Sequence, residues 1–219
     1  MSMLTDRPAW LAPLNDPRNE EILSAAFDVF AEKGIEGATM LEIATRAKVS
    51  KETLYARFDS KEGLFYALLA WGSRQSALDP DAWSPDWTAD PAAQLKAYAA
   101  ACLIKMMQPE SIDVQRMVIG AAGRQRDVAK VFDEVSCQTS AAIVVKLAEA
   151  LAAHGDVEID DPAAFGNDFI GLLRGNIHND ALLGVGERLS DAALTVHAHR
   201  AMERLLKAYA PTPRMRAAA

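Results

Sequence analysis

The sequence predicts an all-α protein, and three observations lead to that fold class. Apolar residues recur at helical spacing along most of the chain, whereas the alternating pattern of a half-buried strand is missing. The strong helix formers Ala, Leu, Glu, Lys and Arg fill these periodic stretches. Three of the stretches begin with an Asp-Pro pair, at Asp16-Pro17, Asp90-Pro91 and Asp161-Pro162. Aspartate is a favourable N-cap and proline a favourable first helical residue, so each pair indicates a helix start.

The ends of the helices are also legible. Gly34, Gly155 and Gly184 follow periodic runs and suit the left-handed residue that closes many helices. Together these signals predict helices over about 17–33, 40–47, 51–57, 61–74, 91–107, 111–122, 125–154, 162–183 and 191–209.

Composition excludes several classes of protein. The chain has 219 residues and a net charge of −7, and half of its residues are hydrophobic, which is too apolar for disorder. Two cysteines cannot make a disulfide scaffold, and no cluster of ligands indicates zinc, so no metal or cofactor is expected. No apolar run approaches about 18 residues, and no secretory signal is visible. We therefore expect a cytoplasmic protein without a membrane partner.

Residues 39–61 carry the most specific local pattern. Thr39-Met40-Leu41-Glu42 fits a capping box that fixes the start of one short helix. Ser50 is placed to cap the next, and Leu54 and Phe58 are spaced to anchor it to a core. Two short helices across so tight a turn form a helix-turn-helix, whose second helix can enter the major groove of DNA.

The charge of this segment differs from that of the chain. Between residues 46 and 61, five cations face only two anions, which leaves a local charge of +3. A basic face suits phosphate contact. The alternative is a solvated helix face with a few lysines, which any all-α protein can have. The cations are Arg46, Lys48, Lys51, Arg57 and Lys61, and the anions are Glu52 and Asp59.

The stretch from Ile22 to Leu69 resembles the N-terminal domain of TetR-type transcriptional regulators. The resemblance rests on Phe30-x-x-x-Gly34, Thr39, Ile43-Ala44, Val49-Ser50, Leu54-Tyr55-x-x-Phe58 and Ser60-Lys61-Glu62-x-Leu64. Residues from about 91 to 210 resemble, more weakly, the AefR-like C-terminal domain of that family. The resemblance implies an N-terminal arm (1–16), a three-helix DNA-binding domain (17–62), a larger helical ligand-binding and dimerisation domain (63–211) and a disordered tail (212–219).

The resemblance also implies roles for individual residues. The helix over 51–57 becomes the recognition helix, with Lys51, Glu52, Thr53 and Ala56 facing base edges. Lys48 stands where the family commonly has glycine, and a left-handed conformation there would cost on the order of 1 kcal/mol, which a phosphate contact would partly offset. The expected DNA-binding residues are Thr39, Lys48, Ser50, Lys51, Glu52, Thr53, Tyr55, Ala56, Arg57 and Lys61.

In the larger domain the resemblance implies a pocket for a small, mostly apolar effector. Core packing is the alternative for the apolar members of the expected lining. Arg174 and His178 lie four residues apart and could orient a polar or acidic ligand group, or else serve an interface or a solvated edge. The expected lining residues are Trp71, Tyr98, Cys102, Met106, Met117, Phe132, Arg174 and His178.

The resemblance further implies a homodimer on a palindromic operator of double-stranded DNA, held together by a four-helix bundle. Its expected seam contains Phe165, Phe169, Leu172, Leu194, Ala198, Ala201 and Leu205. The leading hypothesis is a ligand-responsive repressor. The alternative is a DNA-binding regulator whose larger domain binds a protein partner and senses no small molecule. No catalytic motif is visible, so we do not expect an enzyme.

Overall fold

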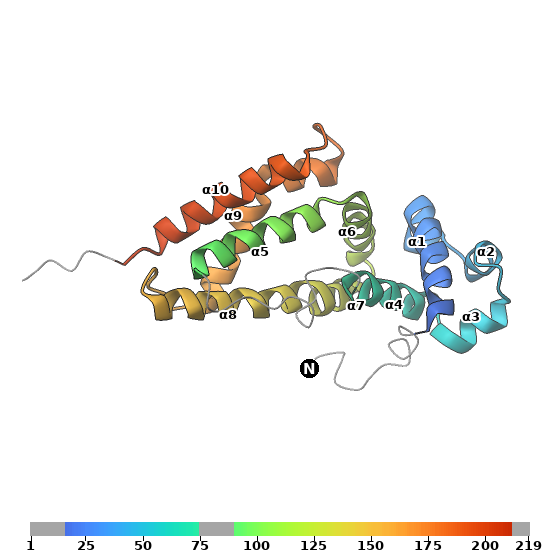
Figure 1. Cartoon of the computed structure of the whole chain (residues 1–219). Coiled ribbons are helices and arrows are strands. Elements are labelled where there is room, and N and C mark those ends of the chain that lie inside the picture. Colours follow the sequence, from blue (N-terminus) through green and yellow to red (C-terminus); the bar gives the residue numbers. More distant parts are fainter. Residues whose placement is uncertain (1–15, 75–89, 212–219) are drawn as a thin grey trace, which may run out of the picture. The chain divides into compact units, whose positions relative to one another are not determined.

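The computed structural model describes residues 16–74 and 90–211, and none of these residues lies in a strand. The prediction of an all-α protein is confirmed (Figure 1). The predicted arm before Asp16 and the predicted tail at 212–219 lie outside the described residues. The elements are α1 (Pro17–Gly37), α2 (Met40–Arg46), α3 (Lys51–Phe58), α4 (Lys61–Arg74), α5 (Pro91–Met106), α6 (Pro109–Ala122), α7 (Arg126–Phe132), the π-helix η2 (Asp133–Cys137), α8 (Gln138–His154), α9 (Pro162–Leu183) and α10 (Asp191–Ala208).

The three Asp-Pro helix starts are confirmed at α1, α5 and α9. The carboxylate of each aspartate accepts a hydrogen bond from a backbone N–H in the first turn. Asp161 accepts two, from the N–H groups of Ala163 and Ala164. These bonds satisfy donors that have no partner inside the helix, and each cap is worth about 1 kcal/mol.

Three helices differ from their predicted form. Helix α1 was expected to end at Gly34 but runs on to Gly37, with Gly34 at φ +70° and ψ 171°. The single helix expected over 125–154 contains a π-helical turn, η2, so its hydrogen-bond register changes before α8. Helix α9 covers its predicted range, but its backbone departs from helical geometry at Gly175, where φ is +48° and ψ is −158°. Gly184 closes α9 in the left-handed conformation, as predicted. The break at Gly175 has no signal in the apolar periodicity.

The described residues divide into two compact units. The first lies within Met1–Asp79 and Pro109–Ser140 and contains α1–α4, α6, α7 and η2. Helix α1 packs against α2, α4 and α6, and α4 packs against α3 and α7. At the centre Phe30 and Phe65 are fully buried with ring centroids 5.2 Å apart, edge to face. Such a pair adds about 1 kcal/mol to the burial of the rings.

The second unit lies within Pro80–Gln108 and Ala141–Ala219. Helix α10 runs along α5 and also packs against α9 (Figure 1). Tyr98 of α5 stacks on Phe169 of α9 with ring centroids 6.2 Å apart, and Phe165 meets Tyr209 at 5.0 Å. These aromatic contacts hold the ends of α9 and α10 against α5. The domain boundaries expected from the sequence stay a prediction.

One helical run, Arg126–His154, is long and apolar enough to cross a membrane by length and composition. The run contains charged residues, so it is not the uninterrupted apolar stretch that the sequence lacks. Of its most apolar window, 33% is buried inside the structure. The core helix of a water-soluble protein passes the same test, so this single run is weak evidence for a span.

Candidate DNA-binding surface

The start of α2 is fixed by the predicted capping box. The backbone N–H of Glu42 donates to Thr39 Oγ1 at 3.2 Å, and the N–H of Thr39 donates to Glu42 Oε2 at 3.1 Å. The Lys33 ammonium of α1 also pairs with the Glu42 carboxylate. The hydrogen bonds from Lys33 and Thr39 lower the pKa of Glu42. At this point Thr39 and its partners form a closed network that fixes where α2 begins.

The turn between α2 and α3 passes through Lys48 in the left-handed region, at φ +55°. The conformation expected at this family glycine position is therefore present with a lysine. The N–H of Lys48 donates to Thr45 O at 3.3 Å, and the N–H of Val49 donates to Ala44 O at 3.0 Å. The Lys48 side chain is exposed, while Val49 packs against the core.

Helix α3 has one face in the core and one face outside. Leu54 and Phe58 are buried, as predicted, and Ser50 Oγ accepts the N–H of Thr53 at 3.1 Å to cap the helix. The Lys51 ammonium lies 5.6 Å from the centroid of the Tyr55 ring. This cation–π contact holds both side chains on the outer face. The exposed residues of that face are Lys51, Glu52, Tyr55 and Ala56, with Thr53 half-buried at its edge.

Arg57, at the end of α3, is tied to the start of α1. Its Nη1 donates to Asp16 Oδ2 at 2.9 Å and to Asn19 Oδ1 at 2.6 Å. Asp16 uses its other oxygen to cap α1, accepting from the N–H of Arg18 at 3.0 Å. The hydrogen bonds from the Arg18 backbone and the Arg57 side chain lower the pKa of Asp16. Sequence reasoning assigned Arg57 to the DNA backbone and missed these two hydrogen bonds, whose acceptors lie 38 and 41 residues away.

Two other predicted cations also have partners within the first unit. Arg46 makes a two-pronged ion pair with Glu32 of α1, at 2.6 and 2.9 Å. Lys61 Nζ donates to the carbonyl oxygens of Glu36 and Ala38, at 3.1 and 3.0 Å, so it holds the link between α1 and α2. The local charge of +3 is therefore partly neutralised by α1. Among the described residues, Lys48 and Lys51 have no ion pair.

The turn from α3 to α4 brings two backbone segments unusually close. Asp59 adopts a positive φ of +64°, and the backbone then doubles back so that Gly63 approaches the carbonyl of Phe58. A Cβ at Gly63 would overlap Phe58 O well inside van der Waals contact. Sequence reasoning did not single out Gly63, although a glycine in the first turn of an otherwise apolar helix is a signal for close approach.

The residues expected to line an effector pocket fall in both units, and most of them are core residues. Trp71, Met117 and Phe132 belong to the first unit, where all three join the apolar core. Tyr98 and Cys102 are buried in the second unit, and burial raises the pKa of the Cys102 thiol to about 12. Met106 and Arg174 are half-buried, and His178 is 5% exposed. Their role as lining residues stays a prediction.

Six of the seven residues expected at the subunit seam are covered by the protomer itself. Their side chains are at most 4% exposed in the single chain. The apolar stripe that they form packs α9 and α10 against each other and against α5. These six are Phe165, Phe169, Leu194, Ala198, Ala201 and Leu205, whereas Leu172 is 37% exposed, and the predicted subunit seam stays a prediction.

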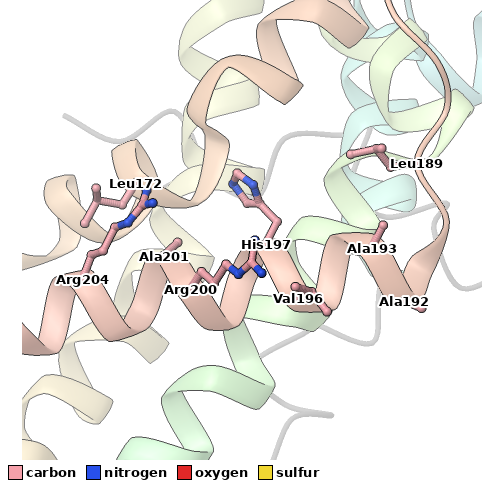
Figure 2. Close-up of a pocket in the computed structure, with 9 residues that line it drawn as sticks. All are labelled: Leu172, Leu189, Ala192, Ala193, Val196, His197, Arg200, Ala201 and Arg204. Carbon is pink, nitrogen blue, oxygen red and sulfur yellow. The ribbon is translucent and has the colours of Figure 1, made fainter.

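The outer face of α9 and α10 carries an open groove of about 590 Å³. Leu172, Leu189, Val196 and three alanines supply its apolar part, and His197, Arg200 and Arg204 supply its polar part. Figure 2 shows Arg204 extending toward Leu172, and His197 pointing from α10 toward α9. Val196 is 50% exposed, so this groove is an uncovered apolar surface with a basic rim.

Comparison with known proteins agrees with this geometry. Residues 22–68 match the model of bacterial regulatory proteins of the tetR family, and residues 93–211 match the C-terminal domain of AefR-like transcriptional repressors. The structure resembles a flavonoid-responsive regulator, FrrA, with 28% identity and a TM-score of 0.73, covering 89% of this chain and 97% of that one. It also resembles a TetR regulator from Agrobacterium tumefaciens, with 27% identity and a TM-score of 0.67, covering 89% and 95%.

A curated relative, the HTH-type transcriptional activator FasR of Mycolicibacterium smegmatis, is 48% identical over 54 residues. That match covers 25% of this chain and 25% of the relative, so the likeness to curated relatives is concentrated in about a quarter of their length. The two matched domains together cover the helix-turn-helix and most of the remaining helices. The chain belongs to the TetR family of DNA-binding transcriptional regulators.

Proposed function

We propose that the chain is a ligand-responsive transcriptional repressor that binds a palindromic operator as a homodimer. The observation that carries the DNA-binding part is the division of α3 into two faces, with Leu54 and Phe58 buried and Lys51 and Tyr55 exposed. A short helix that is anchored on one side and open on the other can enter a major groove without unfolding anything.

The proposed DNA contacts divide into contacts with bases and contacts with phosphates. Lys51, Glu52, Thr53 and Ala56 face base edges, where an ammonium can donate to guanine and a carboxylate can accept from cytosine. Lys48, Tyr55, Ser50 and the first turns at Thr39 and Lys61 meet phosphates. The Arg57 hydrogen bonds to Asp16 and Asn19 support a further role for this residue, which is to set the angle of α3 against α1.

Fluorescence anisotropy tests this assignment with a labelled duplex from the DNA that flanks the coding region. Lys51→Ala and Tyr55→Ala should each weaken binding at least about tenfold, since one good base or backbone contact is worth about 1–3 kcal/mol. Lys48→Ala should lower the salt slope of log K by about 1 per subunit. The charge-matched control is Lys207→Ala, on the exposed side of α10. Equal losses in Lys207→Ala and Lys51→Ala would reject the assignment.

The ligand response is proposed to act through α4. This helix packs against α1, α3 and α7, so a shift of α4 changes the position of the recognition helix. The responsive neighbour FrrA and the match to a repressor domain support this part of the proposal, while the relative FasR is an activator. A Trp71→Phe variant should change the effector concentration that releases operator DNA and leave the affinity without effector within about twofold. If Trp71→Phe loses both the effector response and the operator affinity, the proposed role of Trp71 is rejected.

The homodimer is proposed to form across the groove on α9 and α10. Leu172 of α9 and Val196 of α10 are exposed apolar residues, and a second copy of the chain would cover both. Analytical ultracentrifugation should show a dimer for the wild type and a monomer for the double variant Leu172→Asp/Val196→Asp. The control Val185→Asp, on an exposed residue after α9, should remain a dimer. If the double variant is still a dimer, the subunit interface does not lie at this groove.

A further inference from the structure

Helix α9 is interrupted in a way that places two basic side chains on either side of a break. Gly175 leaves helical geometry, which interrupts the regular hydrogen bonding around Leu173. His197 Nε2 of α10 lies 3.1 Å from Leu173 O. Because a carbonyl oxygen only accepts, Nε2 of His197 carries the proton and donates. The break is therefore stabilised by a side chain from the neighbouring helix.

Arg174 and His178, which flank this break, are left with buried nitrogens that have no partner. Arg174 Nε and His178 Nε2 are both shielded from solvent, and no hydrogen bond reaches either atom among the described residues. The His178 side chain as a whole is 5% exposed. Buried polar atoms in native proteins almost always have a partner, so two such atoms near one another need an explanation.

The Arg174 guanidinium supplies the positive charge at this position. Burial lowers the pKa of His178, and the Arg174 guanidinium lowers it further. Arg174 therefore stands next to a neutral imidazole and has no carboxylate partner among the described residues. A guanidinium offers donors in a fixed fork that matches a carboxylate. A carboxylate there would accept from Arg174 Nε, and from His178 Nε2 in the tautomer that carries its proton on that nitrogen.

We infer that Arg174 and His178 form the anchor for the acidic group of the effector, so that the effector is a small carboxylate-bearing molecule with an apolar body. The inference rests on the proposed effector-binding function and names its ligand chemistry. The apolar body suits the buried apolar side chains that α5 and α9 contribute to this unit, among them Tyr98, Phe169 and Leu173. A buried water molecule bonded to both nitrogens is the competing explanation.

The test compares benzoate with benzamide, two flat molecules of nearly equal size of which only the first is an anion. The protein is labelled with ¹⁵N-arginine, and the Nε–H cross-peak of Arg174 is followed while each compound is added to about 10 mM. Benzoate should move that peak and raise the melting temperature by about 2 °C or more, whereas benzamide should do neither. Arg174→Met and the charge-conserving Arg174→Lys should both lose the benzoate effect, as should His178→Leu.

The matched control is Arg188→Met, which removes an exposed arginine of the same unit and should keep the full benzoate effect. Circular dichroism confirms that each variant is folded. An Arg174 peak that benzoate leaves unmoved, or that shows contact with a bound water, overturns the inference. In that event, retained operator binding leaves the regulator function standing. Failure to bind any operator, by contrast, would reject the proposed function itself.

Discussion

The helix-turn-helix and the α9–α10 pair begin from similar capping signals, yet they differ in how their polar side chains are satisfied. In the first, Arg57 and Lys61 each donate two hydrogen bonds inside the unit, and the Thr39–Glu42 box is closed. In the second, Arg174 Nε and His178 Nε2 are buried without a partner among the described residues. The contrast indicates that the first region is a rigid holder for an exposed surface, whereas the second carries two buried nitrogens that the proposed effector anchor would use.

The rigidity of the first region can be broken most strongly at Gly63. A Gly63→Ala variant places a Cβ against the carbonyl of Phe58, and neither backbone segment can move without shifting α3 or α4. The unfolding free energy measured by urea denaturation should fall by about 3 kcal/mol, at the upper end of overpacking effects. A loss below about 0.5 kcal/mol would show that the turn is looser than described.

The buried His178 of the second region predicts a pH dependence. The pKa of His178 lies below its ordinary value of 6.5 because of burial first and the Arg174 charge second. Below pH 6.5 the unfolded chain binds a proton that the folded chain does not, so stability falls as the pH drops toward the folded pKa.

Urea midpoints at pH 7.5 and 5.5 measure this effect. The His178→Leu variant should remove a slope of at most about 1.4 kcal/mol per pH unit. His154→Gln changes an exposed histidine and serves as the control. If His178→Leu and wild type lose stability equally, His178 is not the group that titrates.

The N-caps of α2 and α10 allow a direct comparison of the two regions. Thr39 has a reciprocal partner in Glu42, whereas Ser190 accepts only the N–H of Ala193, at 3.3 Å. Thr39→Ala should cost about 1.5 kcal/mol and Ser190→Ala about 0.5 kcal/mol in thermal denaturation followed by circular dichroism. Equal losses of stability would mean that the hydrogen bond from the Thr39 N–H to Glu42 does not stabilise the helix start.

The smallest expected effect is a gain at Gly171 of α9. A Cβ there meets nothing within 4 Å, and Gly171 is helical and exposed. Gly171→Ala should raise the unfolding free energy by about 0.5–1 kcal/mol, because alanine loses less backbone entropy than glycine. The stability changes expected for alanine at Gly63 and at Gly171 have opposite signs, so the presence of a glycine does not by itself predict whether a position tolerates alanine. A destabilised Gly171→Ala would contradict the open surroundings.

Sequence reasoning succeeded where the interacting groups are close along the chain. The Asp-Pro caps, the Thr39 box and the Ser50 cap each involve partners within a few residues, so their spacing is readable, whereas the left-handed Lys48 was expected from the family resemblance alone. It failed where the partner is distant. Asp16 and Glu32 neutralise Arg57 and Arg46 from 41 and 14 residues away, and no local pattern announces them.

The predicted subunit seam stays a prediction for a related reason. An apolar stripe at helical spacing indicates that one face of the helix is buried, but it does not indicate whether the same chain or a partner subunit buries it. Leu194, Ala198 and Leu205 are covered by their own protomer, while the less conspicuous Leu172 and Val196 are left outside. The break at Gly175 was also unreadable, since neighbouring residues keep the helical period on both sides.

The central claim is that the outer face of α3 reads base pairs. The most direct measurement is the affinity of wild type and Lys51→Ala for the operator and for every single-base-pair variant of it. The account predicts that Lys51→Ala relaxes discrimination by about 1–3 kcal/mol at one symmetry-related pair of positions and leaves the other positions unchanged. A uniform loss across all variants would contradict it, because Lys51 would then be contacting phosphate alone.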